Sequence, residues 1–437
     1  MPDTVTLKPK TFLFLQGPPG VFARKLGNEL RRRGHRVLRV NFCVGDWLNW
    51  RGHEVINYRG RLRDWPGVLR ELIDREGVTD LLYYADRHPY HSAAIAVAGS
   101  AGIRAINYEY GYFRPDFLTF ERGGMSAYSH FPADPGQILD IARNGLPPPN
   151  FTVHFPQPFA KEAINEIAYN LSNVLCVLSF PHYQSDRFYN PFFEYLSWLP
   201  KLFSASRRRM HAESVIADLL AGNASYFVFP LQQESDYQIR ANSPFPHLRD
   251  AVRTVIGSFA ASAPADSRLV IKAHPLQSGM VPWQALVNEH AKTAGVQERV
   301  QFIDGGDLNT LLEHAQGVVL VNSTVGVHAL HTGCPVKVLG VAVFDIPGLS
   351  FQGPLDEFWN APTAPDAALR DAFARVLIAA TQVKGNFYHP EGRAVAVREA
   401  ANRLIDQRVN EPGAFVDPPP RLERARTLGI PVSFGSE

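Results

Sequence analysis

Short apolar runs alternate with segments of helical spacing over the first hundred residues of the chain. The run TFLFLQG at 11–17 predicts a buried strand, and apolar residues three and four apart at 21–34 predict a helix that ends at Gly34. Further strands are predicted at 35–42, 78–85 and 103–109. Strands that alternate with helices over short connections indicate βαβ units, and hence a parallel sheet.

The pattern changes after residue 150 and returns after residue 222. Segments 159–175 and 190–206 have helical spacing but no strand beside them, which predicts a helical insertion. Alternation then resumes, with strands predicted at 225–232, 267–275, 299–305, 317–324 and 335–340. The chain is therefore expected to form a second α/β lobe.

Four parts follow from these patterns. We expect an N-terminal α/β lobe at 1–149, a helical insertion or bridge at 150–222 and a second α/β lobe at 223–360. Residues 361–437 are expected to form two helices, at 365–385 and 393–408, that pack back on the lobes and end in a loose proline-rich tail. In such folds ligands bind in the cleft, beyond the carboxyl ends of the strands.

Composition narrows the class of protein. Of 437 residues, 45% are hydrophobic and 20% charged, and the formal net charge of +2 does not indicate a nucleic-acid binder. Cys43, Cys176 and Cys334 have neither metal-binding nor disulfide spacing, which suits a reducing compartment. The apolar run near the N-terminus is too short for a signal peptide or a membrane span. We therefore expect a cytoplasmic protein.

Two strand ends carry groups that bind anions. The segment IKAHPL places Lys272, His274 and Pro275 at one strand end, and Asn322, Ser323 and Thr324 lie where another strand meets a helix. Histidine, lysine, hydroxyl groups and the free N–H groups of a helix start can all donate to phosphate oxygens. A surface turn and an ordinary helix cap remain the simpler alternatives.

Two further segments carry carboxylates. NYEYGYFRPDFLTFE, at 107–121, is read as an aromatic-rich loop and contains Glu109, Tyr112 and Arg114. The strand-to-helix connection in 227–245 contains Gln232, Asp236 and Gln238. A salt-bridged surface loop and a helix cap are the alternatives here. If both segments face the cleft, they bring two carboxyl groups together.

Several familiar sites are missing from the sequence. Gln16 and Gly17 begin a turn with two prolines, which fits neither a dinucleotide-binding loop nor a Walker loop, although the turn can face the cleft. The sequence has no H-E-x-x-H, no C-x-x-C and no G-x-S-x-G. We therefore expect no metal site and no serine hydrolase.

Taken together, these motifs resemble the KpsS-type capsule polysaccharide synthesis and export family, the capsular β-Kdo transferases. The resemblance runs from about residue 11 to about residue 390 and includes FLFLQGPPGVFARKLG, NYEYGYFRPDFLTFE, FPLQQESDYQIR, IKAHPL and VNSTVGVHALHTGCPVKVLG. It implies a GT-B-like fold. It also implies transfer of the sugar acid Kdo from CMP-β-Kdo to a phosphatidylglycerol-type lipid, which starts the β-Kdo linker of a capsule.

The resemblance also assigns roles. It places His274 and Pro275, with Lys272 and residues 322–324, at the donor phosphate. It places Glu109 and Asp236 in the family's carboxylate motifs. From their places beside predicted strand ends, we expect Gln16, Gly17, Tyr112, Arg114, Gln232 and Gln238 along the cleft. A β-linked product from a β-linked donor requires retention of configuration, which two displacements through a carboxylate can give.

We assign Asp236 as the nucleophile and Glu109 as the acid/base. Arg240 and Lys272 are expected to lower the pKa of Asp236, and apolar surroundings to raise that of Glu109. No metal or cofactor is expected.

The expected partners are CMP-Kdo, the lipid acceptor, a second Kdo transferase and the capsule export machinery, and no nucleic acid. Basic residues at 206–211 beside the aromatic segment 192–203 predict a peripheral position on the inner face of the cytoplasmic membrane, although a solvated helix end also fits. Two other functions stay open. One is a sugar-nucleotide epimerase of GT-B fold, and the other is a non-catalytic accessory protein of capsule export.

Overall fold

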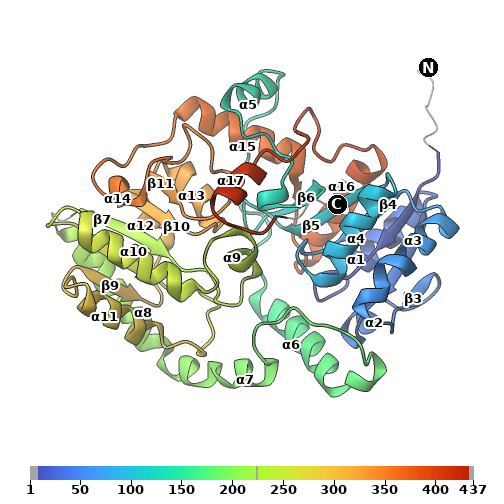
Figure 1. Ribbon diagram of the computed structural model, residues 1–437, viewed down its shortest axis with the longest axis horizontal. Helices are drawn as coiled ribbons and strands as arrows, with labels where there is room; N and C mark the ends of the chain where they lie inside the picture. Colours follow the sequence, from blue (N-terminus) through green and yellow to red (C-terminus); the bar gives the residue numbers. More distant parts are fainter. Residues whose placement is uncertain (1–7, 223–224, 433–437) are drawn as a thin grey trace.

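The computed structural model describes residues 8–222 and 225–432, which form two α/β lobes, each built on one sheet (Figure 1). Within these residues the N-terminal sheet has the strand order β12-β6-β5-β4-β1-β2-β3, and the second sheet has the order β11-β10-β7-β8-β9. This confirms the predicted fold class of two Rossmann-like lobes with a helical insertion and C-terminal helices.

The N-terminal lobe buries its central strands on both faces. Phe12 and Phe14 of β1 pack on one side of the sheet, whereas Leu13 and Leu15 pack on the other. The elements of this lobe are β1 (Thr11–Phe14), α1 (Phe22–Arg32), β2 (Arg36–Asn41), α2 (Val44–Asn49), β3 (Val55–Asn57), η1 (Leu62–Asp64), α3 (Trp65–Glu76), β4 (Asp80–Tyr83), α4 (Pro89–Ser100), β5 (Arg104–Tyr110), β6 (Phe117–Arg122), η2 (Ser126–Tyr128) and α5 (Pro135–Ala142).

The segment 107–121 is not the loop that was predicted. Glu109 lies within β5, and β6 returns antiparallel to it, so this edge of the sheet is a hairpin. The turn depends on Gly111, because a Cβ there would lie 2.3 Å from the carbonyl oxygen of Phe117. Glu109 therefore lies near the end of the strand predicted at 103–109, and the residues that follow it form a hairpin.

The helical segment touches both lobes (Figure 1). It contains α6 (Phe159–Leu175), η3 (Val177–Ser179), α7 (Pro191–Leu196) and α8 (Trp198–Ala221). The Gly45 N–H of α2 donates to Asn173 of α6 at 2.7 Å, whereas Ile216 of α8 packs in the core of the second lobe. The predicted boundary between this segment and the second lobe falls on residues 223–224, outside the described residues.

The second lobe also buries both faces of its sheet. Val228, Val270 and Val318 pack on one side, and Phe229 and Ile271 on the other. Its elements are β7 (Tyr226–Pro230), α9 (Tyr237–Asn242), α10 (Leu248–Ser262), β8 (Arg268–Lys272), α11 (Trp283–Thr293), β9 (Val300–Ile303), α12 (Leu308–His314), β10 (Gly317–Leu320), α13 (Val325–Thr332), β11 (Val336–Val338) and α14 (Leu355–Phe358). All its paired strands run parallel.

The chain then returns to the first lobe. α15 (Ala367–Thr381) is followed by β12 (Gln382–Lys384), which pairs antiparallel with β6, and α16 (Pro390–Ile405) packs against α1. The predicted helix at 365–385 is therefore too long, because its last residues form a strand. The chain therefore connects the two lobes twice, first through the helical segment and again through this return.

The predicted loose tail is also wrong for the residues described. Residues 422–427 form α17 (Leu422–Thr427), and the buried guanidinium of Arg421 donates to the carbonyl oxygens of Phe131, Pro132, Ala342 and Val343. These carbonyls belong to segments of both lobes. The tail therefore links the two lobes through the hydrogen bonds of Arg421, next to α17, which lies between the lobes (Figure 1). The last predicted tail residues, 433–437, lie outside the described residues.

Candidate functional site

A cavity of about 820 Å³ lies between the two lobes and is closed on one side by the helical segment. Most of the predicted site residues line it: Glu109, Tyr112 and Arg114 from the first lobe, and Gln232, Asp236, Gln238, His274, Asn322, Ser323 and Thr324 from the second. They meet because they lie at or just beyond the ends of strands whose carboxyl edges face one another.

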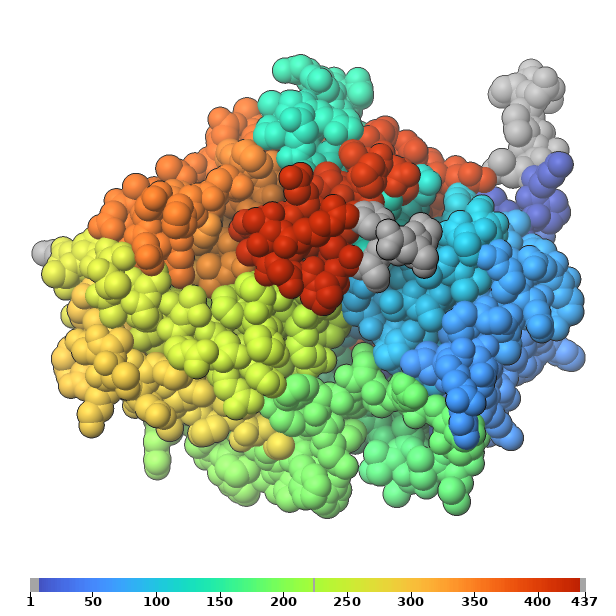
Figure 2. Space-filling model, in the orientation of Figure 1, coloured from blue at the N-terminus to red at the C-terminus, as the bar shows by residue number. Residues whose placement is uncertain are grey.

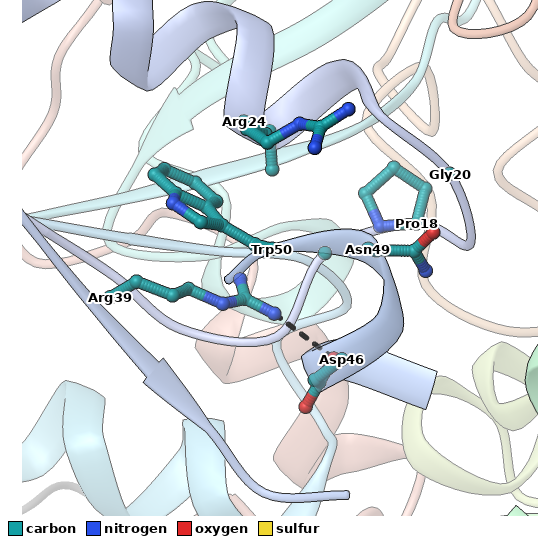
Figure 3. A pocket seen from close by; sticks show the side chains of 9 residues that line it. Pro18, Gly20, Arg24, Arg39, Asp46, Asn49 and Trp50 are labelled. Atoms are coloured by element: carbon teal, nitrogen blue, oxygen red, sulfur yellow. Dashed lines mark hydrogen bonds and ion pairs between the residues drawn. The ribbon is translucent and has the colours of Figure 1, made fainter. Parts of the chain in front are cut away.

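Gln16 and Gly17 do not line this cavity. Gln16 is buried, and its amide donates to the hydroxyl groups of Tyr169 and Tyr183, both from the helical segment. Gly17 borders a separate small pocket beside the Arg39–Asp46 ion pair of 3.0 Å (Figure 3). A Cβ at Gly17 would lie 2.6 Å from the Tyr108 hydroxyl oxygen, so this turn is shaped by packing.

Lys272 and Pro275 also lie outside the cavity lining. Lys272 is buried at the end of β8, and burial lowers its pKa, although Asp304 and Asp307 act to raise it. Pro275 is exposed. Of the three residues predicted to contact phosphate at this strand end, His274 is therefore the one that lines the cavity.

Glu109 is tied to the opposite lobe by Tyr237. The Tyr237 hydroxyl donates to Glu109 Oε2 at 3.0 Å, and it lies 3.4 Å from Oδ1 of the buried Asp86. Enclosure in the cleft raises the pKa of Glu109 to about 8; the negative charges of Asp86 and Asp236 add to this, while the Tyr237 hydrogen bond and Arg114 oppose it. Glu109 therefore exchanges its proton close to neutral pH, as a general acid or base must.

Asp236 has a different environment. Its carboxylate accepts from the Gln238 backbone N–H at 2.9 Å, as the N-cap of α9, and from the Gln232 side-chain amide at 3.2 Å. Burial raises its pKa, while these two hydrogen bonds and the charges of Arg114 and Arg240 lower it. Arg240 thus acts in the expected direction, but burial dominates and leaves the pKa of Asp236 raised.

A polar network holds the second lobe in place around Asp236. Gln232 donates to Asn322 Oδ1 at 2.9 Å, and Asn322 donates to the Gln238 carbonyl at 2.9 Å. Ser126 of η2 donates to the Gln238 side chain at 2.8 Å from the first lobe. Gln232, Gln238 and Asn322 thus position the cleft walls, and their side chains are already engaged within the protein.

His274 presents one N–H group to the cavity. Its Nδ1 accepts from the Leu276 backbone N–H at 3.0 Å. Burial and the nearby positive charges of Arg114, Lys272 and Lys201 lower its pKa to about 4. The ring is therefore neutral at physiological pH, with its proton on Nε2, where it can donate to a ligand oxygen.

Arg114 supplies a positive charge to the cleft. Its guanidinium lies over the Tyr110 ring at 4.8 Å, and no carboxylate of the described residues lies within ion-pair distance of it. Across the cleft, Ser323 and Thr324 precede α13. Arg114, His274 and these two hydroxyl groups make the cavity suitable for a ligand with more than one anionic group.

Sequence reasoning missed several residues that build the site. Tyr237 and Asp86 control Glu109, and Asp86 could have been found because it follows β4 at the same sheet edge. The helical segment contributes Glu166, Arg187 and Glu194, among others, to the cavity wall, and Arg187 pairs with both carboxylates at 3.2 and 2.7 Å. Nothing in the helical spacing indicated which side of these helices would face the cleft.

Over 8–222 and 225–432, no group of three His, Cys, Asp or Glu side chains is arranged to hold a metal ion. No helix in those ranges combines the length and the apolar character needed to cross a bilayer.

Comparison with known proteins identifies the family. The model of the family described as "Capsule polysaccharide biosynthesis protein" matches residues 79–388, which include Glu109, Asp236 and His274. The chain belongs to this capsule polysaccharide biosynthesis family. It is 33% identical over 387 residues to "Capsule polysaccharide export protein KpsS" of Escherichia coli, covering 88% of this chain and 98% of KpsS.

Other members and solved structures are also similar to this capsule polysaccharide biosynthesis protein. "Capsule polysaccharide modification protein LipB" of Neisseria meningitidis serogroup A is 32% identical over 391 residues, covering 87% of this chain and 92% of LipB. Among solved structures, the KpsC β-Kdo 2,7 transferase of Thermosulfurimonas dismutans is 14% identical with a TM-score of 0.43, over 91% of this chain and 99% of that one.

Proposed function

We propose that the chain is a retaining glycosyltransferase that transfers Kdo from CMP-β-Kdo to a phosphatidylglycerol-type lipid and so starts the β-Kdo linker of a capsular polysaccharide. Membership of the capsule biosynthesis family supports a role in capsule assembly. The observation that carries the proposed activity is the pair of carboxyl groups of Glu109 and Asp236, which face one cavity from different lobes in differently tuned environments.

The anion-binding side of the cavity suits a CMP-sugar. His274 Nε2–H and the hydroxyl groups of Ser323 and Thr324 would donate to the phosphate, which leaves with the cytidine. Kdo carries a carboxylate of its own, and the unpaired guanidinium of Arg114 would bind it. CMP-Kdo thus has two anionic groups, and the cleft has a matching region for each: His274 with Ser323 and Thr324 for the phosphate, and Arg114 for the carboxylate.

The chemistry divides into two displacements. In the first, a carboxylate oxygen of Asp236 attacks the anomeric carbon, and the bond to the CMP phosphate breaks, so that CMP leaves with the bonding electrons. In the second, an acceptor hydroxyl attacks the same carbon and releases Asp236, while Glu109 takes the hydroxyl proton. Two inversions leave the configuration unchanged.

Each carboxyl group is suited to its own step. A nucleophile must be ionised, and Asp236 accepts two hydrogen bonds that stabilise its charged form against the burial that raises its pKa. Glu109, with a pKa of about 8, can both take up and release a proton near neutral pH. This difference supports the order of the assigned roles.

The product distinguishes the proposal from its alternatives. The purified protein is incubated with CMP-Kdo and a fluorescent phosphatidylglycerol-type acceptor, and the product is measured by mass spectrometry and its linkage by NMR. One added β-Kdo supports the proposal, and EDTA should not change the rate. An isomerised or free sugar formed without acceptor would favour the epimerase alternative. No consumption of CMP-Kdo would favour an accessory role in capsule export.

A further inference from the structure

Exposed apolar side chains are concentrated on one part of the surface. Leu178 is 90% exposed and Phe203 91%, and Ile164, Leu175, Phe192 and Phe193 are each more than half exposed. Among the described residues, the large exposed apolar side chains lie in 150–222 or in two segments packed against it, α2 and 276–280, apart from Val68. The surface formed by α6, η3, α7 and the first half of α8 is here called the helical face.

The helical face forms one whole side of the molecule. In Figure 2 it is the green surface along the lower edge, and Figure 1 shows α6 and α7 beneath both lobes. Contiguous exposed apolar side chains on soluble proteins mark a surface that binds a protein partner, a ligand or a membrane. We therefore ask what kind of partner covers the helical face.

The unpaired exposed charges of the helical face are positive. Its acidic side chains have partners: Glu162 accepts from Tyr110 and Gln157, whereas Glu166 and Glu194 pair with Arg187. Lys201 and Arg208 of α8 pair with Asp304, but Lys161 and Arg207 are exposed, and within the described residues neither has an ion-pair partner. An apolar surface with outward positive charge is complementary to an anionic bilayer.

The helical face is continuous with the cavity. Phe159 and Ile167 of α6 are exposed on the surface and also line the cavity, as does Trp198 at the start of α8. These apolar side chains therefore belong both to the helical segment and to the wall of the cleft that holds Glu109 and Asp236. A hydrocarbon chain can lie along such side chains without entering water.

We infer that the helical face docks on the surface of an anionic bilayer and that its apolar continuation into the cavity admits the acceptor lipid from the bilayer. This inference rests on the proposed function for the identity of the acceptor. The aromatic and aliphatic side chains enter the boundary between headgroups and acyl chains, and Lys161 and Arg207 lie among the headgroups. The cleft then opens toward the membrane that supplies its substrate.

Vesicle flotation of the full chain tests the docking. Wild type is expected to float with vesicles of phosphatidylcholine containing phosphatidylglycerol, and much less with phosphatidylcholine alone. The double variant Leu178→Ser/Phe203→Ser should lose roughly tenfold or more in partitioning on both vesicle types. Lys161→Glu/Arg207→Glu should lose roughly tenfold on the anionic vesicles only, at low salt.

Matched controls carry the same chemical changes elsewhere. Val68→Ser removes an exposed apolar side chain from α3, and Arg63→Glu reverses an exposed charge on η1, outside the helical face. Both should float like wild type. Equal flotation of the four altered proteins and wild type, or no flotation of wild type, would overturn the docking. So would a stable dimer in light scattering that Leu178→Ser/Phe203→Ser converts to a monomer, because a second copy would then cover this face.

Activity measurements separate this inference from the proposed function. Phe203 and Leu178 do not line the cavity, so the double variant should transfer Kdo normally to a short-chain acceptor in solution and poorly to the same headgroup in vesicles. Equal rates on both acceptors would contradict entry from the bilayer. Vesicle binding by a protein that transfers no Kdo would keep the docking and refute the proposed function.

Discussion

Tyr237 of the second lobe places its hydroxyl 3.0 Å from Glu109 Oε2 of the first. The ionisation of Glu109, which its burial in the cleft shifts most, therefore also depends on a contact between the two lobes. The Tyr237 hydrogen bond stabilises the carboxylate, whereas the charge of Asp86, on the other side of the same hydroxyl, destabilises it. The two neighbours act on the pKa of Glu109 in opposite directions.

Substitutions of Tyr237 and Asp86 are expected to shift the pH profile of the enzyme in opposite directions. Because the transfer step needs ionised Glu109, the turnover number should rise with pH through about 8. Tyr237→Phe removes a hydrogen bond that lowers the pKa of Glu109, so the midpoint should move to higher pH. Asp86→Asn removes a charge that raises it, so the midpoint should move to lower pH. Stopped assays across pH 6–10 measure both.

Tyr195→Phe is a matched control for Tyr237→Phe. The Tyr195 hydroxyl belongs to the same cavity wall but accepts from Asn170 at 3.1 Å and does not contact Glu109. Its loss should leave the midpoint unchanged. Shifts of Tyr237→Phe and Asp86→Asn in the same direction would show that Glu109 is not the group observed.

His274 is expected to bind the donor phosphate as a neutral donor. His274→Ala should raise the KM for CMP-Kdo and lower turnover, because a hydrogen bond to a charged group contributes roughly 1.5–3 kcal/mol. Thr324→Val should have a smaller effect. Since the pKa of His274 is about 4, the donor KM of wild type should stay constant between pH 6 and 9. A KM that increases as pH passes 6.5 would indicate a protonated His274 instead.

Asp236→Asn should remove nearly all turnover while the protein still folds and binds CMP. Asparagine caps helices as well as aspartate does, so the start of α9 should survive the change. Calorimetry with CMP and circular dichroism check binding and folding separately from activity. Full activity of Asp236→Asn would overturn its role as nucleophile.

The sequence predicts more about the lobes than about the helical segment, for a physical reason. Buried parallel strands are read directly from apolar runs, and the facing carboxyl edges of the two sheets bring Glu109, Asp236 and His274 into one cleft. An amphipathic helix shows that it has an apolar side but not what covers that side. Thus Gln16 was expected in the cleft, whereas Tyr169 and Tyr183 of the helical segment enclose it.

The electrostatics of the site could be predicted only in part. The apolar surroundings that raise the pKa of Glu109 were visible in its tyrosine-rich segment. The effect on Asp236 was not, because its outcome depends on how far burial outweighs Arg114 and Arg240, which is a property of the folded cleft. Lys272 was expected to lower the pKa of Asp236, yet the charged groups that act on Lys272 itself are Asp304 and Asp307.

Glu109→Gln should trap the first intermediate and also stabilise the protein at high pH. Without a base for the acceptor proton, the sugar should remain on Asp236, and intact-protein mass spectrometry after incubation with CMP-Kdo would detect one added Kdo. Peptide mapping should place it on Asp236. An adduct on another residue would refute the assignment of the nucleophile.

The stability effect follows from the sign of the pKa shift. A carboxyl group with a folded pKa of about 8 and an ordinary unfolded value of 4.5 binds its proton more tightly when folded. The stability of wild type therefore decreases as pH rises from about 4.5 to about 8, and is lowest, as far as Glu109 determines it, above 8. Glutamine is neutral at every pH and avoids this loss.

The melting temperature of Glu109→Gln should thus exceed that of wild type by a few degrees at pH 9, since 1 kcal/mol shifts it by roughly 2–4 °C in a domain of 150–250 residues. At pH 5 the two should differ little. A variant that is less stable than wild type at pH 9 would show that Glu109 is not held in the protonation equilibrium inferred from its surroundings.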